Sequence, residues 1–144
     1  MNESRETMAR DILASTRSIA IVGASDKAHR DSHHVMAYLI EAGFAVYPVN
    51  PNAPRIHGRP CHPSLADAAR AAPASIDTVV CFRRSEEILP IATAAIAIGA
   101  RHLWMQLGVV NEAAKDLAER AGLKVVMNRC ILVDHQRIMR AASR

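Results

Sequence analysis

Five short runs of apolar and often β-branched residues recur along the chain, each bounded by turn-forming residues. They cover 18–23, 44–50, 76–82, 102–106 and 123–127. Such runs are typical of strands that are buried on both faces of a parallel sheet. This feature constrains the fold most, because parallel strands need crossover connections of about a dozen residues or more.

Helical segments fit into the connections between these runs. Ser32 and Asn111 are the expected N-caps of two helices, since short polar side chains accept hydrogen bonds from the free amides at a helix start. The proline-rich residues 50–63 are expected to form a loop. Two further helices are expected, over 1–16 at the front of this unit and over 131–142 at its back.

The alternation of strands and helices predicts one α/β domain over residues 1–144. We expect a Rossmann-like, doubly wound parallel sheet of five strands with right-handed crossovers and helices on both faces. A switch between the first and fourth strands gives the predicted order 3-2-1-4-5. Ligands bind beyond the carboxyl ends of such strands, so the residues that follow each strand are the candidate site residues.

Composition excludes several classes of protein. No apolar run approaches the ~20 residues that a membrane span needs, and the first residues lack the apolar core of a secretory signal, so we expect no membrane association and a cytoplasmic location. Cys61, Cys81 and Cys130 lack the spacing of a disulfide framework or a zinc site and are expected to be reduced thiols. The net charge of +4 suits an anionic ligand. Scattered basic residues and an aromatic content of 3% argue against nucleic-acid binding.

The segment after the first run has the composition of a phosphate-binding loop. Gly23 permits a sharp turn and a close backbone approach, Ser25 offers a hydroxyl group, and Lys27 and Arg30 supply positive charge. The alternative is an ordinary turn with solvated charges. The dinucleotide fingerprint G-x-G-x-x-G is absent, and Asn50 stands where a ribose-binding carboxylate is expected, so NAD is disfavoured.

Five strand-end motifs together resemble the family of coenzyme A-binding domains. This family comprises small stand-alone relatives of the amino-terminal domain of the succinyl-CoA synthetase α subunit. The motifs occur in order over nearly the whole chain: IVGASD at 21–26, VYPVNP at 46–51, VCFRRS at 80–85, LWMQLGV at 103–109 and VVMNRC at 125–130. The resemblance implies a Rossmann-like domain that binds coenzyme A.

The resemblance also implies roles for individual positions. Gly23, Ala24 and Ser25 would contact the diphosphate, and Asn50 and Pro51 would border the adenosine. Phe82 and Arg83 would line the end of the third strand, with Arg83 facing a phosphate. The pantetheine arm would be approached by Gln106, Asn128, Arg129 and Cys130. The family usually has Asp at the position of Asn128. The Asn in this chain lacks the negative charge of Asp but can still form hydrogen bonds.

Three readings of Cys130 remain open: a buried thiol, a partner for a mixed disulfide with CoA, and a nucleophile. Arg129 and the start of the last helix could favour its thiolate, and His135 is the histidine to test for contact with it. Trp104 is expected in the core. The histidine spacings do not indicate a metal site.

We therefore expect a CoA-binding or acyl-CoA-binding protein, a carrier or sensor, rather than an enzyme. One alternative is a small CoA-dependent acyltransferase or thioesterase. The other is a regulator that binds NAD or an adenine nucleotide. The sequence does not distinguish free CoA from acyl-CoA as the ligand, and it does not indicate an oligomeric state.

Overall fold

The computed structural model describes residues 2–143 and contains a parallel sheet of five strands. The strands follow the five apolar runs: β1 (Ser18–Val22), β2 (Ala45–Val49), β5 (Thr78–Cys81), β6 (His102–Met105) and β7 (Lys124–Val126). The helices are α1 (Asn2–Ala14), α2 (Asp31–Glu41), α3 (Leu65–Ala71), α4 (Ile88–Ala97), α5 (Glu112–Arg120) and α6 (Ile131–Ala142), with a short 3-10 turn at Ser85–Glu87 before α4. The doubly wound α/β class is confirmed.

The strand order is β2-β1-β5-β6-β7, which is 2-1-3-4-5 in the numbering of the five runs. The predicted order 3-2-1-4-5 is wrong, and Pro48 supplies the physical reason. The carbonyl of Pro48 accepts a hydrogen bond from the amide of His62 on the side of β2 away from β1, so its missing N–H faces that side as well. A proline there leaves the ladder one donor short, which suits an edge strand. The third run therefore pairs with β1.

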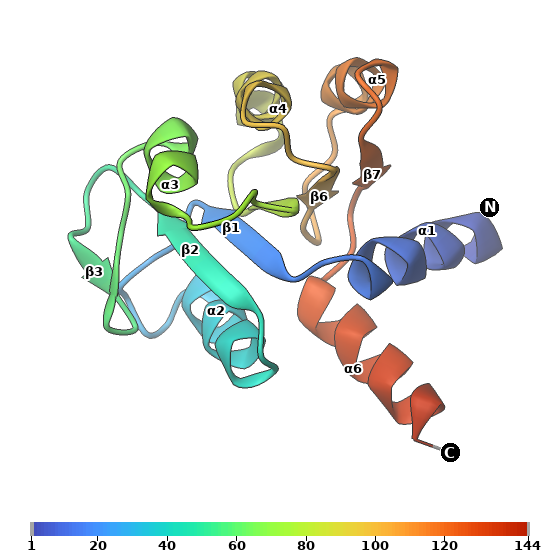
Figure 1. The fold of residues 1–144 in the computed structure, drawn as a ribbon. Coiled ribbons are helices and arrows are strands. Elements are labelled where there is room, and N and C mark those ends of the chain that lie inside the picture. Colours follow the sequence, from blue (N-terminus) through green and yellow to red (C-terminus); the bar gives the residue numbers. More distant parts are fainter. Residues whose placement is uncertain (1, 144) are drawn as a thin grey trace.

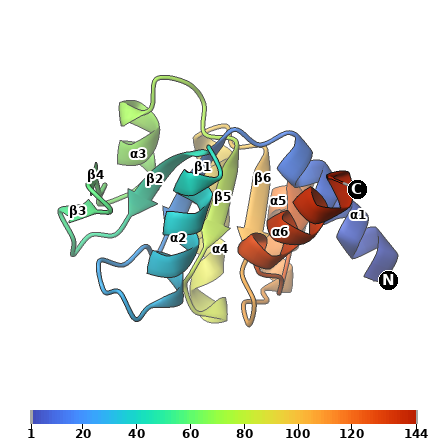
Figure 2. The same ribbon diagram turned by 90° about the horizontal axis from the view of Figure 1, so that it is seen from below.

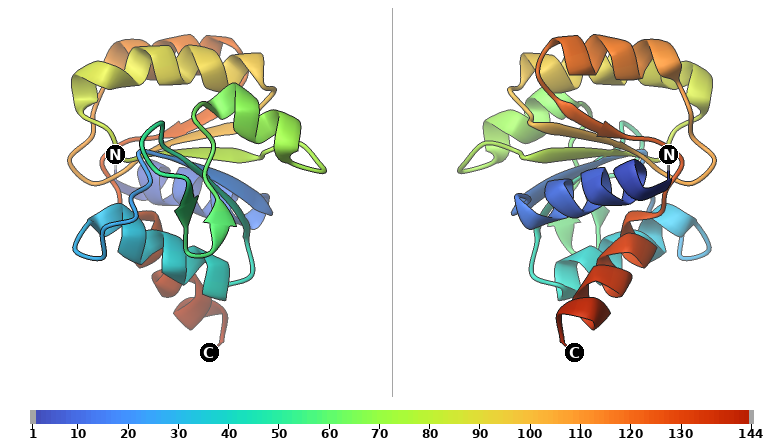
Figure 3. Two further views of the ribbon diagram at one scale, coloured as in Figure 1. Left: turned by 90° about the vertical axis from the view of Figure 1, so that its left-hand side faces the viewer. Right: turned by 90° about the vertical axis from the view of Figure 1, so that its right-hand side faces the viewer.

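Helices cover both faces of the sheet (Figures 1 and 3). One core lies under α3, α4 and α5, and the other lies under α1, α2 and α6. Alternate strand residues point to alternate cores: Leu103 and Met105 of β6 face the first, while Trp104 faces the second. Trp104 is fully buried, as the sequence predicts, and its indole N–H donates to the carbonyl of Arg129 at 2.8 Å.

The two terminal helices lie on the same face. Ala9, Ile12 and Leu13 of α1 share a core with Ile131 of α6, so these helices do not flank the unit at front and back as expected. Met1, part of the first predicted helix, lies outside the described residues. Within residues 2–143, no helix combines the length and apolar character needed to cross a bilayer.

Local capping agrees only in part with the sequence. Asn111 caps α5, and its side-chain oxygen accepts from the amide of Ala114 at 2.9 Å. Ser32 is not a cap, since Arg30 is the N-cap residue of α2 and Ser32 is buried inside the first turn. The segment expected to be a loop, 50–63, contains a small hairpin of β3 (Arg55–Ile56) and β4 (Arg59–Pro60). Ile56 anchors that hairpin because it is buried in the second core.

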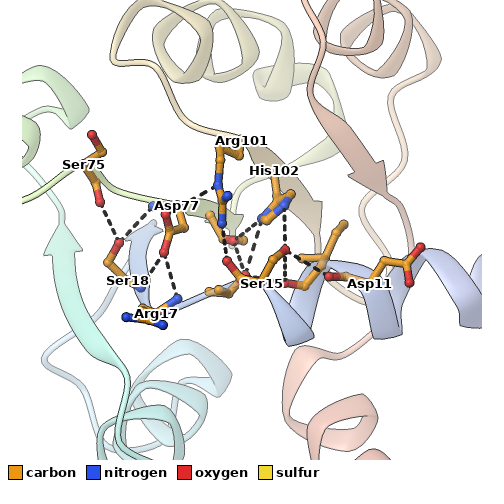
Figure 4. Close-up of polar contacts among 11 residues, drawn as sticks. Asp11, Ser15, Arg17, Ser18, Ser75, Asp77, Arg101 and His102 are labelled. Carbon is orange, nitrogen blue, oxygen red and sulfur yellow. Dashed lines mark hydrogen bonds and ion pairs between the residues drawn. The ribbon is translucent and has the colours of Figure 1, made fainter.

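A polar cluster joins α1 to the amino ends of the strands (Figure 4). His102 is 3% exposed; its Nδ1 lies 2.8 Å from the Thr78 hydroxyl and its Nε2 lies 3.3 Å from the Ser15 hydroxyl. The Asp77 carboxylate accepts from the backbone amide of Arg17 at 2.8 Å. This end of the sheet is thus closed by internal hydrogen bonds, whereas the loops at the other end form the clefts described below.

Candidate functional site

The loops that follow β1 and β6 and the start of α4 project from one end of the sheet (Figure 2). This is the carboxyl end of the parallel strands. Two clefts open among these loops, with volumes of about 880 Å³ and 790 Å³. They are neighbours, since they share four lining residues: Arg30, Asp31, Phe82 and Arg83.

The first cleft lies between the ends of β1, β2 and β5. It brings together eight of the residues that the sequence analysis selected: Gly23, Ala24, Ser25, Lys27, Arg30, Asn50, Phe82 and Arg83. Pro51 is exposed and is not among the described residues that line either cleft. Most of the predicted phosphate and nucleotide positions thus share one concave surface.

Gly23 allows two strand ends to approach each other. Its φ is +91°, and its amide donates to the carbonyl of Val49 at 3.1 Å. A Cβ at this position would lie 2.8 Å from the carbonyl carbon of Phe82 and closer still to its oxygen. The sequence predicts that this glycine permits a close approach of the backbone to a phosphate. In the structure, the close contact between the ends of β1 and β5 already requires a glycine at this position.

Asn50 ties the loop after β1 to the end of β2. Its side-chain amide donates to the carbonyl of Ala24 at 2.7 Å, and its side-chain oxygen accepts from the amide of Asn52 at 2.7 Å. Ala24 is fully buried. In the same loop the Ser25 hydroxyl accepts from the amide of Lys27 at 3.1 Å. These bonds fix the wall of the first cleft.

The first cleft contains unpaired positive charge. Lys27, Arg30 and Arg83 line it, and within residues 2–143 none of the three forms an ion pair. Asp26 and Asp31 also line the cleft, so the side-chain charges sum to a small positive excess. The start of α2 adds the positive end of a helix dipole, and no side chain in the described chain caps it. This arrangement favours an anionic group.

The second cleft lies between the loop after β6 and the start of α6, and it brings Gln106 and Cys130 together. The side-chain oxygen of Gln106 accepts from the amide of Ile131 at 2.9 Å, which caps α6. Cys130 is the N-cap residue of α6 but makes no capping bond through its side chain. Cys130 is half-buried, packs in part against the second core and lines the cleft.

Asn128 and Arg129 follow β7, as the sequence predicts, but their side chains are held by other parts of the protein. Asn128 has a φ of +59°, and its side-chain oxygen accepts from the amide of Gly108 at 2.7 Å. Arg129 forms two hydrogen bonds with the buried Asp134, at 2.7 and 2.9 Å, and these raise its pKa. Among the described residues, these two side chains therefore line neither of the two clefts, and they hold the loop after β6 and the start of α6.

His135 does not pair with the Cys130 thiol in the described part of the chain. Its Nδ1 lies 2.6 Å from the Tyr38 hydroxyl, and its ring meets those of Tyr38 and Phe44 edge to face. Burial lowers the pKa of His135. Within residues 2–143, no group of three or more His, Cys, Asp or Glu side chains is arranged to hold a metal ion.

Comparison with known proteins gives a consistent set of relatives. The family model described as a CoA binding domain matches residues 17–136. The protein YneT of Bacillus subtilis is 36% identical over 126 residues, covering 88% of this chain and 90% of the relative. A solved structure of a hypothetical protein from Pyrococcus horikoshii is 39% identical, with a TM-score of 0.86, and the match covers 93% and 92% of the two chains.

A larger enzyme shares the fold. The dinucleotide-forming acetyl-coenzyme A synthetase 1 of Ca. Korarchaeum cryptofilum matches with a TM-score of 0.64 at 23% identity. The match covers 76% of this chain and 25% of the enzyme. At this identity the likeness concerns the fold alone.

Proposed function

Because the chain belongs to the family of CoA-binding domains, we propose that it binds coenzyme A or an acyl-CoA across the two neighbouring clefts, as a carrier or sensor. The observation that carries the proposal is that a cleft lined by unpaired cations adjoins a cleft lined by a cysteine, Cys130. Coenzyme A has a matching sequence of groups, with phosphates at one end and a pantetheine thiol at the other.

The first cleft would hold the nucleotide part. Lys27, Arg30 and Arg83 would neutralise the diphosphate and the 3′-phosphate, since charge-assisted hydrogen bonds to phosphate are among the stronger polar contacts. The start of α2 would add backbone amides and its dipole. Asn50 would act indirectly, because its side chain already binds backbone groups. Arg30, Phe82 and Arg83 border both clefts, so the arm would pass over them toward Cys130.

The enzymatic alternatives need a base beside the thiol. The histidine that the sequence analysis singled out, His135, is engaged with Tyr38 instead. A single domain with an anionic-ligand cleft and this thiol is therefore better suited to holding the ligand than to cleaving a thioester. The end of β2 does not support the NAD alternative. Asn50 stands there in place of a ribose-binding carboxylate, and its side chain forms hydrogen bonds within the protein.

Ligand-dependent stability tests the proposal. A ligand present at about 100 times its dissociation constant raises the free energy of unfolding by about 2.7 kcal/mol. We expect CoA to raise the midpoint of thermal unfolding and NAD to leave it unchanged. The double variant Lys27→Ala/Arg30→Ala should lose the CoA effect. Arg17→Ala, which removes an exposed cation at the opposite end of the strands, should retain it. Stabilisation by NAD and not by CoA would contradict the proposal.

A further inference from the structure

Two exposed hydrophobic side chains border the second cleft. Leu107 is 70% exposed and Val133 is 53% exposed, and both line this cleft together with Cys130. Leu107 belongs to the loop after β6, and Val133 lies in the first turn of α6. Exposed hydrophobic side chains that share one concave surface are characteristic of a binding site, whereas single ones are common anywhere on a protein.

The loop that carries Leu107 is held on two sides. The Ser85 hydroxyl accepts from the amide of Val110 at 3.0 Å, and the side-chain oxygen of Asn128 accepts from the amide of Gly108 at 2.7 Å. The start of α6, which carries Val133, is fixed by the Gln106 cap. These hydrogen bonds fix the backbone on which the two exposed side chains stand.

We propose that Leu107 and Val133 hold the acyl chain of an acyl-CoA thioester, so that the physiological ligand carries an apolar chain and is not free CoA. This inference rests on the proposed binding of CoA in the two clefts. The pantetheine sulfur would end near Cys130, and a chain attached to that sulfur would continue into the part of the same cleft that Leu107 and Val133 border.

The charges around the second cleft favour an apolar chain over a dicarboxylic one. Arg84 is paired with Glu87 at 3.2 Å, and Asp31 and Glu87 both line the cleft. Arg30 and Arg83 also border the first cleft and would be used by phosphate groups. A terminal carboxylate on the acyl group would thus meet no arginine left for it, and Asp31 would repel it.

The expected effect follows from the partial burial of methylene groups. Full burial of one methylene strengthens binding about fourfold, and an open groove that covers about half of its surface gives about twofold. This twofold gain multiplies over the methylene groups that an octanoyl chain has beyond an acetyl group. We therefore expect octanoyl-CoA to bind roughly 50-fold more tightly than acetyl-CoA. Succinyl-CoA should bind no more tightly than acetyl-CoA.

Isothermal titration calorimetry with CoA, acetyl-CoA, succinyl-CoA and octanoyl-CoA tests the inference on the full chain. We expect the double variant Leu107→Ser/Val133→Ser to reduce the preference for octanoyl-CoA over acetyl-CoA from roughly 50-fold to about fivefold. Met139→Ser, which removes a side chain that is also 53% exposed but does not line the cleft, should leave the preference unchanged.

The outcomes separate this inference from the proposed function. Binding of CoA with equal affinities for acetyl-CoA and octanoyl-CoA would overturn the acyl site and leave the CoA site in place. The same conclusion would follow if the double variant and Met139→Ser kept the same preference. A failure of all four ligands to bind would instead overturn the proposed function itself.

Discussion

Replacement of Gly23 by alanine tests the close contact between the ends of β1 and β5. Gly23 has a φ of +91°, and a Cβ there would lie 2.8 Å from the carbonyl carbon of Phe82. Gly122 is a matched control, since its φ is +95° and a Cβ there would meet no atom within 4 Å. Both substitutions introduce the same backbone strain, but only one forces a strand end to move.

The magnitudes follow from these two contributions. A side chain in the left-handed region costs about 1–2 kcal/mol. Displacing well-packed backbone adds about 1–3 kcal/mol. We therefore expect Gly23→Ala to lower the free energy of unfolding by about 3 kcal/mol and Gly122→Ala by about 1–2 kcal/mol. Urea denaturation at neutral pH measures both, and an unchanged dependence on urea would show that the unfolded states are comparable.

Equal losses of stability in Gly23→Ala and Gly122→Ala would refute the contact with Phe82. The pair also bears on ligand binding. Gly23 lies at the end of β1 and lines the first cleft, so a displaced strand end should weaken CoA binding as well as the fold. Gly122 follows α5, away from both clefts, so its variant should bind CoA normally once it is folded.

Three further predictions concern charge and thiol chemistry. Burial lowers the pKa of His102 from 6.5 to about 4, so the unfolded state binds more protons between these values and stability falls as the pH falls through them. In urea denaturation His102 should account for a loss of about 1–2 kcal/mol between neutral pH and pH 5, so His102→Gln should lose that much less stability than the parent protein; equal losses in the two proteins would exclude this role of His102. Arg83→Ala should weaken CoA about tenfold and dephospho-CoA less than about threefold, by calorimetry; equal losses would show that Arg83 does not meet the 3′-phosphate. In CoA disulfide, the Cys130 thiolate should attack one sulfur, form a mixed disulfide and release CoA thiolate, which intact-protein mass spectrometry detects as one adduct absent from Cys130→Ser. Burial raises the pKa of Cys61 and raises that of Cys81 to about 12, so an adduct on either would contradict the placement of the arm.

The sequence by itself determined the five strands of the parallel sheet and the end of that sheet at which a ligand would bind. Strand-forming runs and capping residues act locally, so β1, β2, β5, β6, β7 and the Asn111 cap lie where the sequence predicts them. A parallel sheet gathers the residues after its strands at one edge. This is why eight predicted positions meet in the first cleft without any knowledge of strand order.

Only the tertiary structure decided how the strands are ordered and what several side chains contact. The order depends on which strand can tolerate an open edge, and Pro48 in the second run is a signal in the sequence that indicates it. Asn128 and Arg129 follow the last strand, where ligand-binding residues are expected. Their side chains nevertheless form hydrogen bonds with Gly108 and Asp134. Such partners come from segments distant in sequence or from the next helix, and packing alone brings them within hydrogen-bonding distance.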